Sequence, residues 1–591
     1  MSWTSYQPVS ARFDDLVGGS TLAFRGARRV LAAHEPEDVV PLLAEVERAT
    51  TAGCWAFGYL AYEAAAGLDP RWAVVDRPAD ERLPLAVFAL CGPPDVTPPV
   101  PPPGGGPRGY AAGPWRRDWT EPAYRDDVAR VRAHIAAGET YQLNLTVRLD
   151  APVDGDLTQL YANLAWAQQG SHAAYLDLGR FAVVGASPEL FFEWRDDALV
   201  TRPMKGTTPR GRTTAEDAER RNRLVASEKE RAENLMIVDL LRNDLGQIAE
   251  VGSVQVTALF TPERYGTVWQ LTSEVTARPR PGTTLVDVFR ALFPSGSVTG
   301  APKQRTMELI RELEHRPRGV YCGAVGVVAP PGSAGFRARF NVPIRTMTVD
   351  RADGTAEFGT GGGITWASDA AAEHAELLAK TAILAEPFED FGLIETMAHV
   401  PREGLRNLAG HLDRLADSAA YFGFRFSRVD VAGELRTAVD PDAAARVRLV
   451  LRRHGAVEVA TAPLPEDSEQ PVRLAVDPDP VDADQLWFRH KTTRRGVYTE
   501  RAARRPDVDD VVLVDRHGQV TETTVANVAA LVDGTWLTPP LSAGCLPGVE
   551  RARLVAAGEL RERSLSIDDL RRADALALVS SLRGWRPAVL S

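Results

Sequence analysis

Residues 359–380, GTGGGITWASDAAAEHAELLAK, decide how the larger part of this chain is interpreted. Ser368 and Asp369 are good helix N-cap residues, and the alanines and leucines that follow them have high helix propensity. The spacing therefore predicts a helix after Asp369. On such a helix Glu373, Glu376 and Lys380 fall on one narrow face.

A second segment upstream repeats the carboxylate spacing. Residues 227–244, SEKERAENLMIVDLLRND, also favour a helix and carry Glu230 and Glu233 three residues apart. Like charges so close repel, but two such pairs become favourable when they face one another across a hard cation. Oxygen-only ligation points to Mg²⁺. The alternative is two solvated charged helices.

The composition sets limits on the class of protein. At 591 residues the chain exceeds the roughly 250–300 residues of a single core, so several domains are expected. The net charge of −11 argues against a general nucleic-acid binder. No apolar run reaches the roughly 18 residues of a membrane span and no signal peptide is recognisable, so we expect a cytoplasmic protein without membrane association. The four scattered cysteines indicate reduced thiols rather than disulfides or zinc.

Composition shifts divide the chain. Residues 1–92 read as an N-terminal subdomain of short strands and helices. Residues 93–117 are rich in proline and glycine and are expected to be an extended or mobile connector. Residues 118–385 alternate apolar strands with amphipathic helices, as in a large α/β or α+β domain. Residues 391–591 form a further region of mixed α/β pattern.

Lysine is rare in this chain. It occurs five times, while the other 63 basic residues are arginine. Lysine is then expected chiefly where guanidinium cannot replace it, as a deprotonatable amine or a compact point charge. The alternative for any one of them is an ordinary surface lysine. The five are Lys205, Lys229, Lys303, Lys380 and Lys491.

The order of motifs over residues 118–385 resembles that of chorismate-utilising enzymes. The motifs are GETYQLNLT, GASPELFF, TRPMKGTTPRG, KERAENLMIVDLLRNDLG, FPSGSVTGAPKQRTMELIRELE, RGVYCGAVG, VPIRT and GTGGGITWASDAAAEHAELLAK. The resemblance implies a chorismate-binding α/β sandwich. It also implies that Glu233 and Glu376 bind Mg²⁺ with Glu230 and Glu373 beside them. The residues implied to hold the chorismate carboxylates are Thr299, Tyr321, Arg345, a turn at Gly361, Gly362 and Gly363, and Lys380.

Single positions within these motifs indicate the reaction. Isochorismate and salicylate synthases carry a lysine base where this chain has Gln142. Anthranilate synthases have alanine where PMKGT carries Lys205, as in aminodeoxychorismate synthase component I. The resemblance implies that the Lys205 amine attacks the ring as the C4 hydroxyl leaves, that Glu189 is the general acid, and that ammonia then expels the lysine. Gln270 replaces a family histidine. Because no amidotransferase motif surrounds any cysteine, ammonia is expected from solution or from a separate glutaminase subunit.

The last third resembles fold-type IV pyridoxal-phosphate enzymes, a two-subdomain α/β fold. Its motifs are GHLDRLADSA, FRHKTTRRGVY, GQVTETTVANVAA, WLTPPLSAGCLPGVERARL and SSLRGW. Such a site needs a lysine for the cofactor aldehyde, an acid for the pyridine nitrogen and a phosphate cradle. The resemblance assigns these roles to Lys491, to Glu522, and to Arg414 with the backbone amides of Gly548, Val549 and Glu550. Dimerisation through this domain is possible by the same resemblance.

Together the two resemblances predict a bifunctional enzyme that makes 4-aminobenzoate from chorismate, for folate or another product. An Mg²⁺-dependent synthase would be followed by a pyridoxal-phosphate lyase that removes pyruvate. The alternatives are the same synthase fused to an aminotransferase of other specificity, a catalytically silent C-terminal module, and an anthranilate synthase.

Overall fold

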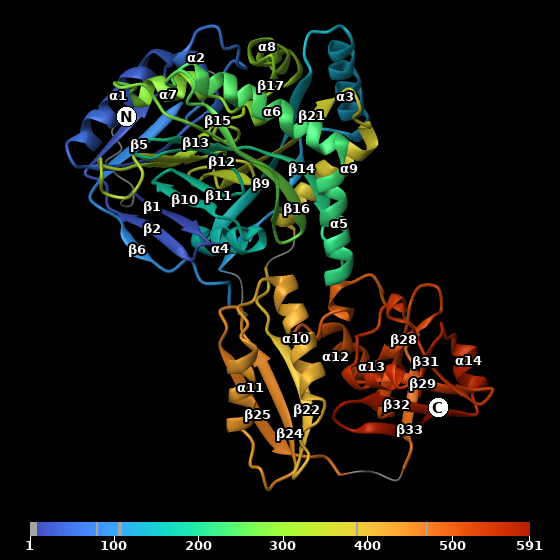
Figure 1. Cartoon of the computed structure of the whole chain (residues 1–591). Coiled ribbons are helices and arrows are strands. Elements are labelled where there is room, and N and C mark those ends of the chain that lie inside the picture. Colours follow the sequence, from blue (N-terminus) through green and yellow to red (C-terminus); the bar gives the residue numbers. More distant parts are fainter. Residues whose placement is uncertain (1–8, 79–80, 105–108, 386–387, 467–469) are drawn as a thin grey trace. The chain divides into compact units, whose positions relative to one another are not determined.

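The computed structural model describes residues 9–78, 81–104, 109–385, 388–466 and 470–591. These residues form two compact units (Figure 1). The first contains residues 1–210 and 221–390, and the second contains residues 211–220 and 391–591. This multidomain α/β organisation confirms the predicted fold class.

The first unit contains an eleven-stranded antiparallel sheet with the order β17-β9-β21-β20-β11-β10-β1-β2-β6, and β7 and β8 also pair with β9. Its strands are β1 (Ser10–Asp15), β2 (Ser20–Arg25), β6 (Asp95–Thr97), β7 (Tyr110–Ala112), β8 (Arg116–Arg117), β9 (Gln142–Gly155), β10 (His172–Leu178), β11 (Phe181–Ser187), β17 (Gly300–Ala301), β20 (Thr346–Asp350) and β21 (Thr355–Thr365).

A second antiparallel sheet of ten strands has the order β14-β16-β13-β12-β19-β18-β4-β5-β3, with β15 paired to β16. Its strands are β3 (Arg29–Ala33), β4 (Trp55–Leu60), β5 (Ala86–Cys91), β12 (Leu190–Trp194), β13 (Leu199–Arg202), β14 (Met204–Pro209), β15 (Gln255–Arg264), β16 (Val268–Ala277), β18 (Ala324–Val328) and β19 (Ala338–Asn341).

The two sheets pack face to face around a common core. Phe24 of β2 and Phe57 of β4 come from different sheets and lie 5.2 Å apart between ring centroids. The alternate residues Ala56 and Leu60 of β4 belong to another cluster, which includes Val39 of α1 (Pro36–Thr51). This period of two gives β4 two buried faces, one against the opposite sheet and one under helices (Figure 1).

The remaining helices of this unit flank the sheets and carry much of the candidate site. They are α2 (Ala65–Leu68), α3 (Glu121–Ala136), α4 (Leu157–Gln168), α5 (Thr214–Ala226), which crosses the boundary between the units, α6 (Glu228–Gly246), α7 (Leu285–Leu292), α8 (Lys303–Leu313) and α9 (Ala370–Thr381). The cap prediction for α9 is confirmed, because the Asp369 carboxylate accepts hydrogen bonds from the amides of Ala371 and Ala372.

Residues 1–92, expected to form an N-terminal subdomain, contribute β1 and β2 to the eleven-stranded sheet and β3, β4 and β5 to the ten-stranded sheet. Two other segments differ from their sequence expectation. Residues 93–117 contribute β6, β7 and β8 and are therefore not simply a connector; residues 105–108 lie outside the described part. Gly361–Gly363 form no turn, because they continue β21 along β9.

The second unit contains two sheets. The four-stranded sheet β23-β22-β24-β25 is antiparallel, and the eight-stranded sheet β28-β27-β26-β33-β32-β29-β30-β31 is mixed. The strands are β22 (Leu393–Val400), β23 (Gly404–Leu405), β24 (Ala445–Leu451), β25 (Val457–Pro463), β26 (Val472–Val476), β27 (Asp510–Val514), β28 (Val520–Thr523), β29 (Asn527–Val532), β30 (Thr535–Thr538), β31 (Arg561–Glu562), β32 (Ala575–Ser580) and β33 (Gly584–Leu590).

Each sheet of the second unit has its own apolar core. Val447 and Leu449 of β24 pack with Leu412 and Leu415 of α10, beside α11. The larger sheet buries Leu474 and its neighbours in a separate cluster. The helices are α10 (Leu408–Phe422), α11 (Arg428–Thr437), α12 (Gly496–Ala503), α13 (Val549–Ala556) and α14 (Ile567–Arg572). Across the described residues, helices long and apolar enough to span a bilayer are absent.

Candidate active sites

The first candidate site centres on Lys205 of β14. The buried Asn234 side chain on α6 donates hydrogen bonds to the carbonyls of Lys205, at 3.1 Å, and Leu271, at 3.3 Å. The Ser273 hydroxyl donates to the Asn234 carbonyl oxygen at 2.5 Å. This saturated buried amide ties the strand that carries Lys205 to the helix that carries Glu230 and Glu233.

The Lys205 amine lies against the glycine segment of β21. A Cβ atom at Gly363 would collide with this amine and would lie 3.1 Å from the Gln142 side-chain nitrogen. Gln142 is fully buried, and neither end of its side-chain amide has a hydrogen-bond partner among the described residues. A buried amide without a partner is costly, so this one is suited to a polar ligand beside Lys205.

Two further charged side chains approach the same glycines. The Lys380 amine donates to the Gly361 carbonyl at 2.8 Å and forms an ion pair with Glu376 at 2.9 Å. A Cβ at Gly362 would lie 3.3 Å from a Glu373 carboxylate oxygen. The structure thus brings together Lys205, Lys380 and the predicted α9 carboxylates at one stretch of β21.

The four predicted metal-binding glutamates influence one another. Burial, followed by repulsion from Glu233, raises the pKa of Glu230. Burial raises the pKa of Glu373, and repulsion from Glu376 adds to this effect. The Lys380 charge instead lowers the pKa of Glu376. An all-oxygen set whose members repel suits a hard divalent cation.

The separations between these carboxylates are nevertheless larger than in a closed metal site. Within the described ranges no three His, Cys, Asp or Glu side chains are grouped as metal ligands would be. The Glu233 carboxylate accepts a hydrogen bond from Thr365 at 3.5 Å and lies 4.0 Å from Lys229. The residues fit Mg²⁺ by the chemistry of their oxygen donors.

Glu189 has the protonation behaviour of an acid. It is 4% exposed, and burial raises its pKa to about 7. A hydrogen bond with Ser297 and the Lys205 charge both lower the pKa, but by less than burial raises it. A carboxyl group with this pKa is substantially protonated near neutral pH and so can donate a proton.

The predicted substrate-binding residues Arg345 and Thr299 make contacts outside the glycine segment of β21. Arg345 is held in the left-handed region, donates to the Gln168 side chain and interacts electrostatically with Glu376, while burial lowers its pKa to about 10. The Thr299 hydroxyl donates to the Ser295 carbonyl at 3.0 Å, within its own loop.

Tyr321 lies beneath β21. Its ring packs against Gly359 and lies 5.1 Å from the Arg148 guanidinium. Its charged neighbours include Arg148, Arg318 and Glu314, and the glutamates of α6 and α9 are not among them. Gln270, at the family histidine position, donates to the Thr207 hydroxyl at 3.3 Å.

The second candidate site is a cavity of about 810 Å³ within the second unit. Lys491, Glu522, Arg414, Gly548 and Val549 line it together. Burial lowers the pKa of Lys491 to about 8, and the Arg414 charge adds to this effect. A lysine with this pKa has a sizeable neutral fraction near pH 7.5, as a nucleophilic amine requires.

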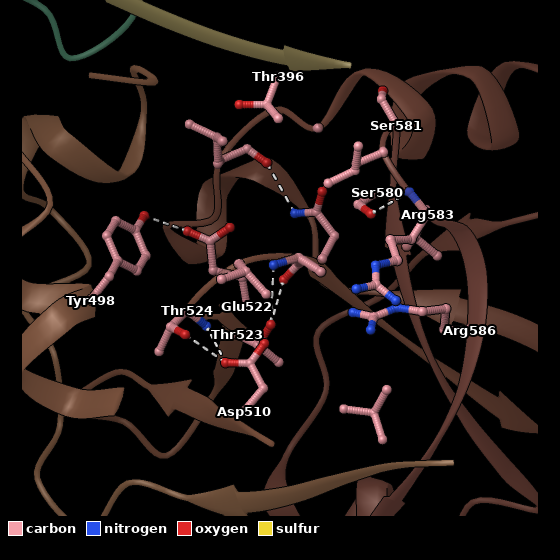
Figure 2. Close-up of a pocket in the computed structure, with 18 of the residues that line it drawn as sticks. Thr396, Tyr498, Asp510, Glu522, Thr523, Thr524, Ser580, Ser581, Arg583 and Arg586 are labelled. Carbon is pink, nitrogen blue, oxygen red and sulfur yellow. Dashed lines mark hydrogen bonds between the residues drawn. The ribbon is translucent and has the colours of Figure 1, made fainter. Parts of the chain in front are cut away.

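Glu522 projects from β28 into this cavity (Figure 2). The Tyr498 hydroxyl donates to its carboxylate at 2.7 Å, and burial raises its pKa to about 7. A buried carboxyl group of this kind gains an ion-pair partner when a pyridinium nitrogen lies beside it.

The predicted phosphate cradle is partly engaged by protein groups. Arg414 donates to Glu395 at 2.8 and 2.5 Å and to the Pro547 carbonyl at 2.9 Å. The predicted Gly548 amide is engaged, because it donates to the Leu546 carbonyl at 2.8 Å. The amides of Val549 and Glu550, in the first turn of α13, have no intrahelical acceptor and suit a phosphate. A Cβ at Gly548 would collide with the side-chain oxygen of Asn527, so a larger residue there would displace the Asn527 side chain.

The Glu550 side chain does not line the cavity. Its carboxylate accepts hydrogen bonds from Asn407 at 2.7 Å and Arg553 at 2.9 Å. Only its amide remains for the cradle. The lysine, the buried acid and the helix N-terminus line one cavity, and these donors fit pyridoxal phosphate.

Sequence reasoning missed several residues that organise these sites. Asn234 follows Glu233 within a quoted motif, but nothing in the sequence pairs it with the Lys205 carbonyl. Glu395 accepts hydrogen bonds from His411 at 2.6 Å and from Arg414. Burial opposes the shift, but the Arg414 charge and these hydrogen bonds lower the pKa of Glu395 to about 2. The sequence signal for Glu395 was a glutamate within the otherwise apolar strand segment LIETM.

Two family profiles match most of the chain. Residues 96–386 match chorismate binding enzymes, and residues 392–590 match amino-transferase class IV. The first match covers both sheets of the first unit apart from the N-terminal strands, and the second covers nearly all of the second unit.

Several similar proteins each match part of this chain. The chain is 43% identical to anthranilate synthase component 1 of Streptomyces coelicolor, over 45% of this chain and 51% of that protein. It is 40% identical to aminodeoxychorismate synthase component 1 of Klebsiella aerogenes, over 45% of this chain and 58% of that protein. The chain thus spans a little over half the length of these relatives. The crystal structure of anthranilate synthase component I from Streptococcus pneumoniae is 25% identical, with a TM-score of 0.51 over 64% of this chain and 90% of that one.

Proposed function

We propose that this chain, in which residues 96–386 belong to the chorismate binding enzymes and residues 392–590 to the class IV amino-transferases, converts chorismate into 4-aminobenzoate in two steps. The first step replaces the C4 hydroxyl by ammonia and releases water. The second eliminates pyruvate from 4-amino-4-deoxychorismate. The observation that carries the first step is the contact between the Lys205 amine and Gly363, beside the unpartnered amide of Gln142.

In the synthase step the protein supplies a nucleophile and an acid. The Lys205 amine attacks C2 of the ring, and protonated Glu189 transfers its proton to the departing C4 hydroxyl. Ammonia then adds at C4, and the bond between Lys205 and C2 breaks. Lys380 holds a substrate carboxylate. The four glutamates of α6 and α9 would hold Mg²⁺, which would neutralise carboxylate charge.

In the lyase step the cofactor would supply an electron sink. Glu522 would hold the pyridine nitrogen, and Arg414 with the first turn of α13 would hold the phosphate. Lys491, with its pKa lowered to about 8, moves a proton between the substrate and its own amine. The position of this domain directly after the synthase supports the assignment, because the lyase consumes the synthase product.

Ammonia comes from a separate glutaminase subunit in this proposal, supported by the "component 1" in the names of the relatives. A homodimer through residues 391–591 stays a prediction. A second candidate activity, anthranilate synthesis, is favoured by the 43% identity to a relative of that name. Lys205 argues against it.

Two variants of the full chain test the two-site assignment. Lys205→Ala abolishes formation of the amino intermediate but leaves pyruvate release from supplied intermediate intact. Lys491→Ala does the reverse. If both variants lose the same half-reaction, the assignment is wrong.

A further inference from the structure

Lys303 is one of the five lysines of this chain, and neither proposed reaction uses it. It is the first residue of α8 and is 7% exposed. Its amine donates one hydrogen bond to the Asp244 carboxylate of α6, at 2.6 Å, and another to the Leu292 carbonyl at the end of α7, at 3.2 Å. One buried amine therefore joins α6, α7 and α8 (Figure 1).

Stability alone does not account for this buried ion pair. Burial raises the pKa of Asp244, and the Lys303 charge opposes that rise. Because both charges lose their hydration, such a pair is often no more stabilising than apolar side chains of similar volume. The start of α8 is also unfavourable for a cation, since the N-terminal end of a helix carries partial positive charge. What the pair does provide is a fixed position for the groups that it joins.

Lys303 and Leu292 flank the loop of residues 293–302, FPSGSVTGAP, and their hydrogen bond closes this loop across its ends. The closed loop packs against α6, because a Cβ at Gly296 would collide with the Leu240 side chain of that helix. The loop is therefore held to α6 at two points, by packing at Gly296 and by the ion pair of Lys303.

Two parts of this loop reach the candidate synthase site. The Ser297 side chain forms a hydrogen bond with the Glu189 carboxyl group. Further along the loop, β17 pairs with β9, and Ala301 lies opposite Gln142. The position of the loop therefore matters both to the proposed acid and to the buried amide beside Lys205.

We infer that Lys303 is a positioning residue of the synthase, because it fixes the loop of residues 293–302 that places Ser297 beside the proposed acid. The inference rests on the proposed synthase function, in which Glu189 donates a proton. A hydroxyl that donates to a carboxylate stabilises the ionised form, so this contact keeps the pKa of Glu189 lower than burial alone would. Within the described ranges the charged side chain that acts on Glu189 is Lys205 of β14, which lies outside the loop.

The test uses the full chain and replaces both partners of the ion pair together. Lys303→Met alone would leave the Asp244 charge buried without its partner, which is strongly destabilising. In the double variant Lys303→Met with Asp244→Leu, an apolar pair of similar volume should preserve the fold, so the midpoint of thermal unfolding should stay within about 5 °C of wild type. Pyruvate release from supplied 4-amino-4-deoxychorismate should be unchanged. The synthase kcat should fall about tenfold or more, because the proposed acid is no longer held in place.

The decisive readout is the pKa of Glu189, measured without turnover. Infrared spectra recorded against pH report the carbonyl stretch of the protonated carboxyl group, identified in each background as the band that Glu189→Gln removes. In the double variant this pKa should rise by about 0.4–1 unit, which corresponds to the loss of one hydrogen bond. The falling limb of the synthase kcat should move to higher pH by the same amount. Ser297→Ala should produce the same rise, and combining it with the double variant should add nothing.

The matched control is Asp239→Leu with Arg242→Met, at an exposed ion pair on the same helix, and it should change none of these quantities. An unchanged synthase kcat in the double variant would overturn the inference, as would an unchanged pKa of Glu189. A double variant that unfolds would assign the ion pair a purely structural role and would overturn the inference as well. If the pKa of Glu189 rises as expected but the wild-type chain forms no amino intermediate, the positioning role stands and the synthase proposal fails.

Discussion

The side-chain amide of Asn234 donates a hydrogen bond to the main-chain carbonyl of Lys205 at 3.1 Å. This bond connects the strand bearing the proposed nucleophile to the helix bearing two of the proposed metal-binding glutamates. The position of the Lys205 amine relative to those carboxylates therefore depends on a residue that does not itself act on substrate.

Removing this connection should impair the synthase selectively. Asn234→Ala leaves two carbonyls and the Ser273 hydroxyl without their partner, at about 1–3 kcal/mol for each unsatisfied group. We expect the synthase kcat to fall about tenfold or more, because a small displacement of a nucleophile is costly. Stopped assays of amino-intermediate formation measure this. Pyruvate release from supplied intermediate should be unchanged, as should both activities of the exposed-residue control Asn222→Ala. Equal loss of both activities would indicate general unfolding instead.

The pH dependence of the synthase should report Glu189. Its pKa lies at about 7, above the ordinary 4.5, so the proton-donating form predominates below pH 7 and declines above it. The synthase kcat should thus fall as pH rises through about 7, by up to tenfold per pH unit. Glu189→Gln should lower kcat by about 10²-fold or more and remove this limb, whereas Glu308→Gln on the exposed face of α8 should do neither. If the kcat of Glu189→Gln still fell as pH rose through about 7, the titrating group would be a residue other than Glu189.

The lyase half should depend on the Glu522 carboxylate and on its hydrogen bond from Tyr498. Glu522→Gln removes the anion that would pair with the pyridine nitrogen, so the lyase kcat should fall about 10²-fold while Lys491 still binds the cofactor. Tyr498→Phe removes one hydrogen bond that lowers the pKa of Glu522, and a loss of about threefold to tenfold is expected. Pyruvate release and cofactor absorbance measure the two effects. Full lyase activity in Glu522→Gln would refute the assigned role.

Chelation of divalent cations should separate the two activities. The α6 and α9 glutamates repel one another without a cation, and only the first unit contains this set. We expect EDTA to abolish amination of chorismate and excess Mg²⁺ to restore it. Pyruvate release from supplied intermediate should proceed unchanged. Synthase turnover that persists at full rate in EDTA would show that the four glutamates do not act through a metal.

Local patterns predicted the helices α6 and α9 well, because their caps and charge spacing are contained in short stretches of sequence. The strand pairing of residues 1–92 and 93–117 was harder to predict, because these strands join sheets whose other strands lie far away in the chain. Whether a glycine run is a turn or a strand also depends on long-range pairing. Gly361–Gly363 extend β21 because β9 supplies partners for their backbone groups.

For the sites, residue types fixed the chemistry but not the supporting contacts. Lys205, Lys491 and Glu522 were assigned from the motifs that carry the two resemblances, and their catalytic roles stay predictions. The bonds from Asn234 to Lys205 and from Tyr498 to Glu522 are long-range contacts between ordinary residues, and only the fold reveals them. At Glu550 the sequence position was informative but the side-chain contacts were not. The residue lies in the first turn of α13, yet its carboxylate accepts hydrogen bonds from Asn407 and Arg553.

The most direct test of the central claim is the product that the purified full-length chain forms from chorismate, Mg²⁺, ammonium and pyridoxal phosphate, resolved against 2- and 4-aminobenzoate standards. We predict 4-aminobenzoate together with an equal amount of pyruvate. Formation of 2-aminobenzoate would contradict the reaction assigned to Lys205, and accumulation of 4-amino-4-deoxychorismate without pyruvate would contradict the lyase assignment of residues 391–591.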